Sequence, residues 1–251
     1  PIFWNFLIKW IDYLILKIVK KVIFVSNATK HSVIQNSGFS SKNINKFKVI
    51  HNGVSIKGNK KKVEKIFKVK KGIIKIGMLS RIEKYKGQED LIKSVILLDK
   101  KYKKKVKFFL IGNGDKKNIS FIQNHIRNNN LEKIVKIYNF IEKDSETILK
   151  NLDLFVSLTR DFEGFGYSTA EAMLYKIPII ATNVGGSKEF LNSLNANIVE
   201  PQDINMIKSL IIDYLENRER WIKKAKFSSK FISKNFNFKI ISKKFKKVLK
   251  I

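Results

Sequence analysis

The chain has 251 residues and no cysteine, with 51 Lys and Arg against 21 Asp and Glu, so its formal net charge is +30 and its pI is about 10.1. The lack of cysteine excludes a disulfide framework and thiolate metal sites, and a hydrophobic fraction of 44% excludes a disordered chain. This length suits one large or two modest domains, each with its own core.

The positive charge comes almost entirely from lysine. Arginine, which can hold a base or a phosphate through two parallel hydrogen bonds, occurs only at Arg81, Arg127, Arg160, Arg218 and Arg220. Lysine, isoleucine and asparagine are enriched together along the whole chain, as expected from an AT-rich coding sequence. Solvated lysines draw a protein toward anionic lipid or nucleic acid at low salt. This charge indicates no specific nucleic-acid partner, and a basic nucleic-acid-binding protein is the alternative that rests on it alone.

The first 23 residues are apolar but interrupted by charged residues, so they leave no run long enough to span a membrane. Apolar residues at three- and four-residue steps predict a helix with one buried face, made of Phe3, Leu7, Trp10, Leu14 and Ile18. A helix that lies in a membrane interface is the alternative.

Beyond this helix the sequence predicts short strands at residues 22–26 and 48–50 and then a regular alternation. Strands are expected at residues 73–79, 106–111, 134–138, 154–158 and 178–182, with helices at residues 88–98, 119–126, 145–150 and 169–174. Near-continuous apolar strands that alternate with helices predict an α/β fold, a doubly wound parallel sheet covered on both faces. The ligand site of such a sheet lies beyond the carboxyl ends of its strands. Residues 204–251 read as three lysine-rich helices.

Two loops after predicted strands carry candidate phosphate-binding residues. In residues 80–87, Arg81 can offer a planar fork of donors and Lys86 a point charge, and the next helix adds its amide dipole. In so lysine-rich a chain, an ordinary basic surface fits these residues equally well. Gly112 opens a turn that lacks the third glycine of the dinucleotide fingerprint. A tight turn is the preferred interpretation there, and close approach of the backbone to a ligand is the alternative.

The most informative segment reads Asp-Phe-Glu-Gly-Phe-Gly-Tyr-Ser-Thr-Ala-Glu-Ala-Met, at residues 161–173. Gly164 and Gly166 let the backbone come close to a ligand. The helix that follows directs its amino end to the same place, which favours a diphosphate. The carboxylate of Glu171 can accept hydrogen bonds from both hydroxyls of a ribose, and Glu163 faces whatever follows the phosphates.

The same residues resemble a known family. The run Glu163-Gly164-Phe165-Gly166, with Glu171-Ala172-Met173 at an eight-residue offset, resembles the retaining nucleotide-sugar glycosyltransferases of family 4. Further matches keep the family's order over about residues 22–203, namely Asn52-Gly53-Val54, Gly77, Arg81, Lys86-Gly87, residues 177–182, Gly185-Gly186 and Glu189.

The resemblance implies a GT-B fold, in which two Rossmann-like domains face each other across a cleft and the second binds most of the donor. It implies that Arg81 and Lys86 hold the donor diphosphate and that Glu163 faces the sugar, so these three form the expected catalytic set. The residues it assigns to donor binding are Gly164, Phe165, Gly166, Ser168, Thr169, Glu171 and Gly112. It implies no metal, and no metal-ligand spacing occurs in the sequence. We expect no cofactor besides the nucleotide-sugar substrate.

The resemblance also implies a function. We expect an enzyme that transfers a hexose from a nucleotide-diphosphate sugar to a glycan or lipid-linked acceptor with retention of configuration, in the synthesis of a cell-surface polysaccharide or glycolipid. We expect a cytoplasmic location, with peripheral contact to an anionic membrane at its inner face. An epimerase or a phosphorylase of the same fold is a further alternative.

The family pattern predicts how the chain is divided. Residues 1–50 correspond to the closing part of the acceptor-side domain, 51–72 to a linker, 73–235 to the donor-binding domain and 236–251 to a helix that crosses back. Because the chain begins with Pro1 and lacks the family's glycine-rich acceptor loop, we expect an N-terminally truncated protein. Lys176 stands where the family has glycine. The three histidines, His31, His51 and His125, match no catalytic position, and we expect them to be structural.

Overall fold

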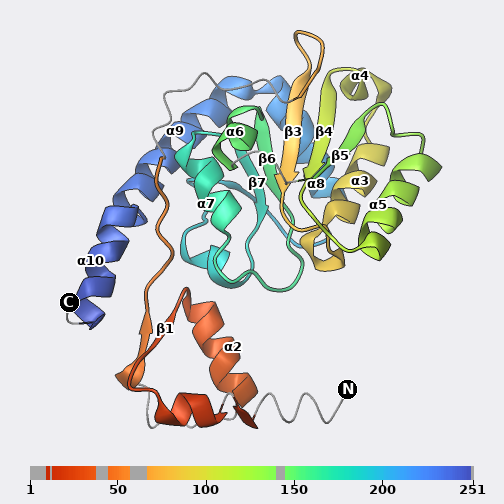
Figure 1. Cartoon of the computed structure of the whole chain (residues 1–251). Coiled ribbons are helices and arrows are strands. Elements are labelled where there is room, and N and C mark those ends of the chain that lie inside the picture. Colours follow the sequence, from red (N-terminus) through yellow and green to blue (C-terminus); the bar gives the residue numbers. More distant parts are fainter. Residues whose placement is uncertain (1–9, 12, 38–44, 57–66, 140–144, 250–251) are drawn as a thin grey trace.

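A parallel sheet of six strands, in the order β5-β4-β3-β6-β7-β8, forms the centre of the larger unit (Figure 1). The computed structural model describes residues 10–11, 13–37, 45–56, 67–139 and 145–249. The strands are β3 (Ile74–Leu79), β4 (Val106–Ile111), β5 (Val135–Tyr138), β6 (Leu154–Ser157), β7 (Ile179–Thr182) and β8 (Asn197–Val199). All neighbouring pairs run parallel. The predicted doubly wound α/β fold is thereby confirmed.

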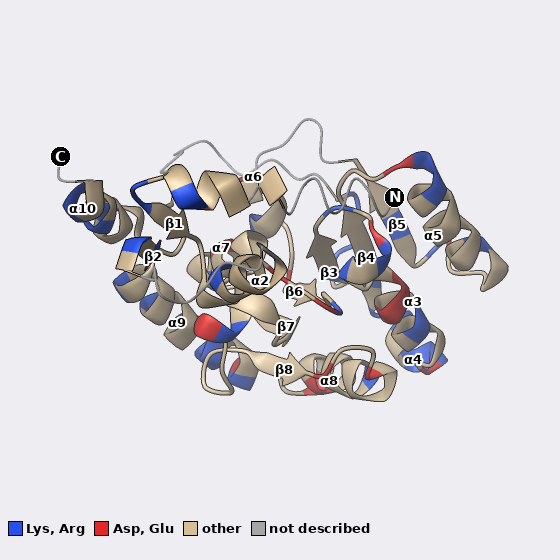
Figure 2. Cartoon of the chain, turned by 90° about the horizontal axis from the view of Figure 1, so that it is seen from below, with Lys and Arg blue, Asp and Glu red and all other residues tan. Residues whose placement is uncertain are grey.

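Helices cover both faces of this sheet, because alternate side chains of each strand point to opposite faces. Phe108 of β4 belongs to the core on one face, and its neighbour Phe109 to the core on the other. One face packs against α3 (Gln88–Ile96), α5 (Lys116–Asn128) and α8 (Ile204–Glu216), and the other against α6 (Ser145–Lys150), α7 (Tyr167–Leu174) and α9 (Arg218–Asn235). In the described part of the chain, Lys and Arg are spread over several outer helices, including α4 (Lys100–Lys103), α5, α9 and α10 (Phe238–Leu249) (Figure 2).

The strand β8 and the helix α4 were not predicted from the sequence. β8 is three residues long and starts with a polar residue, Asn197, which pairs with Ile180 of β7. Its position in the sheet is shown by this pairing. The sequence did not predict the strand, because no apolar run marks it. The helix α4 is a single turn rich in lysine and contributes one buried side chain, Tyr102.

The N-terminal part forms a second, small unit. The strands β1 (Val22–Phe24) and β2 (Phe47–Val49) pair in parallel, and α2 (Asn27–Ser37) packs beside them (Figure 1). Residues 13–18 are helical, as predicted, but of the face expected to be buried Trp10 and Ile18 are exposed, and Leu14 is half-buried. Ile18 is 80% exposed and Trp10 is exposed too, whereas Leu16 is buried against Phe24 and Phe47.

The physical reason is the size of this unit. Its small two-stranded sheet offers two buried apolar residues, Phe24 and Phe47, which cover only the side of the helix that carries Leu16. Phe3 and Leu7, also expected on the buried face, lie outside the described residues. None of the helices within the described parts of the chain combines the length and the apolar character that a membrane span needs.

The two units are joined by two passages of the chain that lie side by side. The N–H of Val54 donates to the carbonyl of Phe236 (2.8 Å), and the N–H of Phe238 donates to the carbonyl of Val54 (3.1 Å). From this crossing α10 runs toward the small unit, where Lys21 Nζ donates to the carbonyl of Val248 (Figure 1). The segment expected as a linker is thus partly core, since Val54 is fully buried and Phe67 stacks on Phe109 with ring centroids 4.0 Å apart.

The end of α7 explains the departure at Lys176. The N–H of Ile177 donates to the carbonyl of Ala172 (3.1 Å), and the N–H of Lys176 donates to that of Met173 (3.0 Å). This is a Schellman motif, whose left-handed position favours glycine, and Lys176 adopts it with φ of +61°. Its side chain is exposed, so the cost of the substitution is limited to backbone strain.

Lys176→Gly is therefore expected to raise the free energy of unfolding by roughly 0.5–1 kcal/mol, because relief of the left-handed strain exceeds the extra flexibility of glycine in the unfolded chain. Urea denaturation of both proteins measures this difference. Lys176→Ala removes the same charge but keeps the strain, so it should not stabilise. Equal gains in both variants would show that the charge of Lys176, and not its backbone, is the cause.

Candidate functional site

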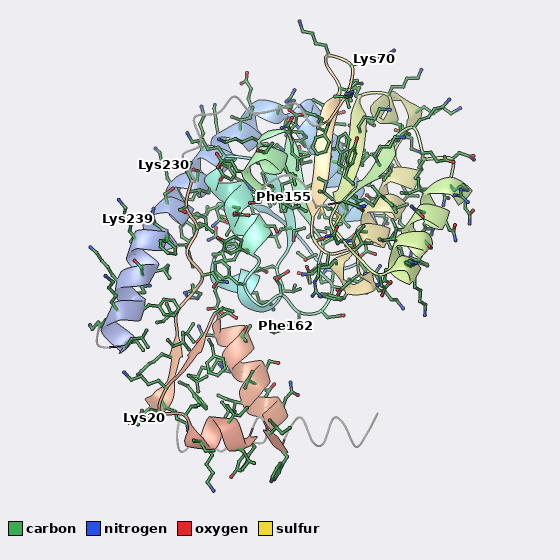
Figure 3. The ribbon with its side chains drawn as sticks, in the orientation of Figure 1. Lys20, Lys70, Phe155, Phe162, Lys230 and Lys239 are labelled. Atoms are coloured by element: carbon green, nitrogen blue, oxygen red, sulfur yellow. The ribbon has the colours of Figure 1, made fainter. Side chains whose placement is uncertain are left out.

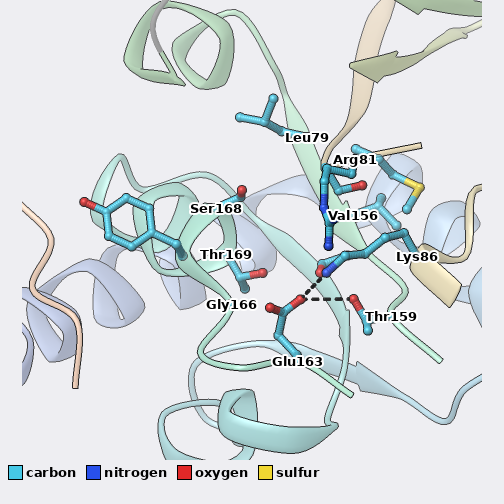
Figure 4. Close-up of a pocket in the computed structure, with 13 residues that line it drawn as sticks. Leu79, Arg81, Lys86, Val156, Thr159, Glu163, Gly166, Ser168 and Thr169 are labelled. Atoms are coloured by element: carbon cyan, nitrogen blue, oxygen red, sulfur yellow. Dashed lines mark hydrogen bonds and ion pairs between the residues drawn. The ribbon is translucent and has the colours of Figure 1, made fainter. Parts of the chain in front are cut away.

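The site lies where β3 and β6 end side by side at the centre of the sheet. The chain continues from β3 to one side of the sheet and from β6 to the other, which is the arrangement that opens a crevice at the carboxyl ends. A cavity of about 190 Å³ occupies this crevice (Figure 4). An adjoining hollow of about 380 Å³ shares Leu79, Ser80 and Arg81 with it and extends to the end of β4. Together they reach the size of a small-molecule pocket, about 300–1,000 Å³.

Lys86 and Glu163 form an ion pair in the first cavity. Lys86 Nζ lies 2.7 Å from Glu163 Oε2, and Thr159 Oγ1 donates to the same oxygen at 3.2 Å (Figure 4). Both charged side chains are mostly buried, which strengthens their attraction relative to water. An ammonium group has three donors, so Lys86 can hold Glu163 and an anionic ligand together.

Arg81 lies where the cavity and the adjoining hollow, the two hollows of the site, meet, and its side chain is largely exposed. Its Nη1 lies 2.7 Å from Glu83 Oε1, and its Nη2 donates to the hydroxyl of Tyr85 at 2.6 Å. Burial raises the pKa of Tyr85, and the hydrogen bond with Glu83 raises it further, so the phenol stays neutral and can accept this hydrogen bond. The guanidinium is therefore held at the rim, in reach of a ligand in either hollow.

The amino end of α7 closes the cavity on the other side. Gly166 precedes this helix, and Ser168 and Thr169 in its first turn line the cavity with their polar groups (Figure 4). Unpaired amides and the helix dipole at such an end favour an anion. With Arg81 and Lys86 opposite, the cavity presents positive charge from two sides.

Glu171 and Gly112, two residues that the family resemblance assigns to donor binding, both line the adjoining hollow. Glu171 is a buried residue, and Ser145 Oγ donates to its Oε1 at 3.0 Å. A carboxylate that is held in place beside hydroxyl groups is suited to bind a diol. Ser145 was not among the residues expected at the site, and only its position as the first residue of a predicted helix could have indicated it.

Two residues expected at the donor do not line either hollow. The ring of Phe165 is buried in an aromatic cluster, 5.2 Å from Phe190 and 5.9 Å from Phe236 between centroids, because an apolar ring packs better there than in a polar crevice. Gly164 faces the small unit instead, where Thr29 Oγ1 donates to its carbonyl at 3.3 Å.

Gly185 and Gly186, the glycine pair of the family motif, contact the backbone of Glu163. The N–H of Gly186 donates to the carbonyl of Glu163 at 2.6 Å. Gly185 has φ of +55°, and a Cβ at this position would overlap the backbone of Glu163. Both a left-handed conformation and close contact therefore require glycine here.

Glu189 connects the site loop to the small unit. Its carboxylate accepts hydrogen bonds from Asn27 Nδ2 (3.0 Å) and the N–H of Ala28 (3.2 Å), both at the amino end of α2, and from His51 Nε2 (2.6 Å). Burial raises the pKa of Glu189, but the hydrogen bonds from His51, Ala28 and Asn27 outweigh it, and the net shift of this pKa is downward.

Glu189→Gln is expected to lower the free energy of unfolding by about 1–2 kcal/mol at neutral pH, since charge-assisted hydrogen bonds are lost. The pKa is lower in the folded state than the unfolded value of about 4.3, so this contribution is present above that pH and disappears as the pH falls through the folded pKa. Denaturation of both proteins across acidic and neutral pH measures the difference. The exposed Glu219→Gln is the control, and a difference from the parent that does not shrink in acid would contradict the assignment.

The other histidines lie away from both hollows. His31 is an exposed residue of α2, and the ring of His125 packs on Phe121 with centroids 5.5 Å apart. Within the described ranges, no three His, Asp or Glu side chains are grouped so that they could hold a metal ion.

The fold and the site together define an α/β protein with a doubly wound domain and, at its switch point, a crevice lined by Arg81, Lys86 and the amino end of α7. The model of the family described as glycosyl transferases group 1 matches residues 59–228, which is more than half of the chain. The chain belongs to this family.

Individual relatives agree with this assignment. The chain is 28% identical over 247 residues to the uncharacterized glycosyltransferase MJ1069 of Methanocaldococcus jannaschii, covering 96% of this chain and 60% of the relative. It is 31% identical over 198 residues to the capsular polysaccharide biosynthesis glycosyltransferase CapM of Staphylococcus aureus, covering 77% of this chain and 49% of the relative. The chain thus spans about half to three fifths of the length of these relatives.

Solved structures show the same fold. The crystal structure of Anabaena Alr3699/HepE in complex with UDP and glucose superposes with a TM-score of 0.79 at 22% identity, over 92% of this chain and 63% of that one. The fold is therefore of the GT-B type, with the Rossmann-like sheet domain complete and the small unit as the closing part of the other domain.

Proposed function

We propose that the crevice binds a nucleoside-diphosphate sugar, with uridine as the nucleoside, and that the complete enzyme transfers the sugar to a glycan or lipid-linked acceptor with retention of configuration. The observation that carries the proposal is the position of Lys86, Arg81 and the amino end of α7 around one cavity, with the buried Glu171 in the adjoining hollow. The HepE structures, which contain UDP or UDP-glucose, support the choice of base.

In this proposal the cations and the α7 amides hold the diphosphate, and Glu171 binds the ribose. Glu163 faces the sugar, kept in place by Lys86 and Thr159. The bond from the anomeric carbon to the phosphate oxygen breaks while the acceptor oxygen bonds to that carbon from the same face, and the acceptor proton passes to the departing phosphate. Positive groups fixed in a partly buried site stabilise the negative charge that grows on the leaving diphosphate.

Titration calorimetry with UDP, GDP and ADP at low and at moderate salt tests the proposal. We expect binding that is selective for UDP and persists as salt rises, and that is weakened by Glu171→Ala. Weak binding that fades equally for all three nucleotides would mean that only lysine charge is measured. In that case tight, salt-dependent binding of duplex DNA would favour the nucleic-acid alternative.

The same proposal includes a cytoplasmic location and peripheral contact with the inner face of an anionic membrane. It is supported by the exposed apolar residues Trp10, Ile15 and Ile18 beside Lys17 and Lys20. Sedimentation with phosphatidylglycerol vesicles at moderate salt checks it, and protein that stays in the supernatant would argue against it.

A further inference from the structure

Arg160 lies beside the site without lining either hollow. It follows Thr159 in the loop between β6 and α7, and its guanidinium holds both carboxylate oxygens of Asp90, with Nε to Oδ2 at 2.8 Å and Nη2 to Oδ1 at 2.5 Å. Nη2 also donates to Glu89 Oε2 at 3.0 Å. The side chain of Arg160 is 10% exposed and that of Asp90 is 2% exposed, so the pair is held inside the protein.

The backbone joins the same two loops. The N–H of Arg160 donates to the carbonyl of Tyr85 at 2.7 Å. Gly87, with φ of +79°, lies so close to the carbonyl of Leu158 that a Cβ would not fit. Two adjacent backbone contacts thus fasten the loop of residues 80–87 to the loop of residues 158–163. One bidentate ion pair fastens the second loop to the first turn of α3, which directly follows the first loop.

These are the loops that carry the ion pair of the site. Lys86 lies between Tyr85 and Gly87, which are both in contact with the second loop. Glu163 is three residues beyond Arg160 in that second loop. The distance between Lys86 and Glu163 therefore depends on how the loops are fastened, and Arg160 supplies the side-chain part of that fastening.

The contact requires arginine. A guanidinium matches two carboxylate oxygens with a rigid planar fork, which the single ammonium of lysine cannot do. In a chain where 51 residues are Lys or Arg and only five of them are Arg, two of the five, Arg81 and Arg160, belong to these loops. The hydrogen bonds that Arg160 donates to Asp90 raise the pKa of Arg160 above its ordinary value, so the guanidinium stays charged.

We infer that Arg160 is a positioning residue of the donor site, which through Asp90 and Glu89 holds Lys86 and Glu163 in the relative geometry that binds a diphosphate. The inference rests on the proposed function, because it concerns the same site. In this inference Arg160 touches no ligand, but it determines how strongly Lys86 contributes to the binding of the diphosphate.

A double-mutant cycle separates positioning from stability. UDP binding is measured by calorimetry for the parent, Lys86→Ala, Arg160→Lys and the double variant. We expect Lys86→Ala to weaken binding by about tenfold or more in the parent, and by less than about threefold in the Arg160→Lys background. A purely structural role would lower the thermal midpoint of Arg160→Lys and leave the full effect of Lys86→Ala unchanged.

Two further variants complete the test. Arg220→Lys is the control, because Arg220 is exposed, pairs with Asp213 and lies on α9 away from the site. In that background Lys86→Ala should keep its full effect. Glu89→Gln removes the charge of one partner of Arg160 and keeps Asp90, so it should reduce the effect of Lys86→Ala partly. It decides the question if Arg160→Lys does not fold.

The outcomes distinguish the two proposals. A parent that does not bind UDP overturns the proposed function, and the inference with it. A parent that binds UDP, with the full effect of Lys86→Ala retained in both the Arg160→Lys and Glu89→Gln backgrounds, overturns the inference alone.

Discussion

Lys86→Ala is expected to weaken UDP binding by about 10- to 100-fold, the largest effect on binding of any single substitution proposed for this chain. The variant loses a mostly buried ammonium group that lies 2.7 Å from Glu163. It also leaves the Glu163 carboxylate without this partner in a cavity where a diphosphate must enter, so repulsion adds to the lost attraction.

Lys84→Ala is the matched control. Lys84 is an exposed lysine in the same 3₁₀ turn as Lys86, Lys84–Lys86, and it lines neither hollow of the site. It removes the same charge two residues away. Calorimetry on both variants distinguishes a specific contact of Lys86 from the general attraction of the nucleotide to a chain with a net charge of +30. Equal losses in the two variants would contradict the role of Lys86.

Phe155→Ala is expected to lower the free energy of unfolding by about 3–5 kcal/mol, the largest effect on stability. Phe155 is 1% exposed, lies in β6, one of the two central strands of the sheet, and packs in the core between the sheet and α7 (Figure 3). Its removal leaves a cavity next to Val156 and Ser157, which line the site, so UDP binding should weaken as well.

Phe162→Ala is the control for this variant. Phe162 is 43% exposed at the edge of the domain and has no place in either core cluster (Figure 3). Its substitution should change stability by no more than about 0.5 kcal/mol. Urea denaturation measures both variants, and a similar loss for the two would mean that the sheet core is not where the structure places it.

The central sheet could be predicted from the sequence because its strands are buried on both faces. Apolar runs such as Val106–Ile111 are then nearly continuous and can be recognised without knowledge of their neighbours. The strand Asn197–Val199 has no such run, and its place at the edge is fixed by pairing with β7. The orientation of the first helix also depends on its neighbours, which explains why Leu16 and not Ile18 is buried.

In the site too, local sequence patterns could be recognised, but contacts between distant residues could not. Lys86, Glu163 and Glu171 could be singled out because they lie in loops or helix ends just after strands, where a doubly wound sheet places its ligand. The partners that hold them could not, since they are far away in the chain. Lys86 and Glu163 are 77 residues apart, and Arg160 and Asp90 are 70 residues apart.

Glu189 was noted as part of a motif, but nothing in the sequence indicated that it binds the amino end of α2, 161 residues earlier. Phe165 shows the opposite case. It belongs to the most informative motif, yet its ring completes an aromatic cluster behind the site. A motif identifies the residues that a loop needs, and the packing decides which of them face the ligand.

A crystal structure of the chain with UDP-glucose is the most direct test of the central claim, that the crevice between β3 and β6 is the donor site. We predict the diphosphate between Arg81, Lys86 and the amino end of α7, with the ribose hydroxyls on Glu171 and the sugar toward Glu163. Electron density for the nucleotide at any other place, with this crevice empty at saturating ligand, would contradict the account.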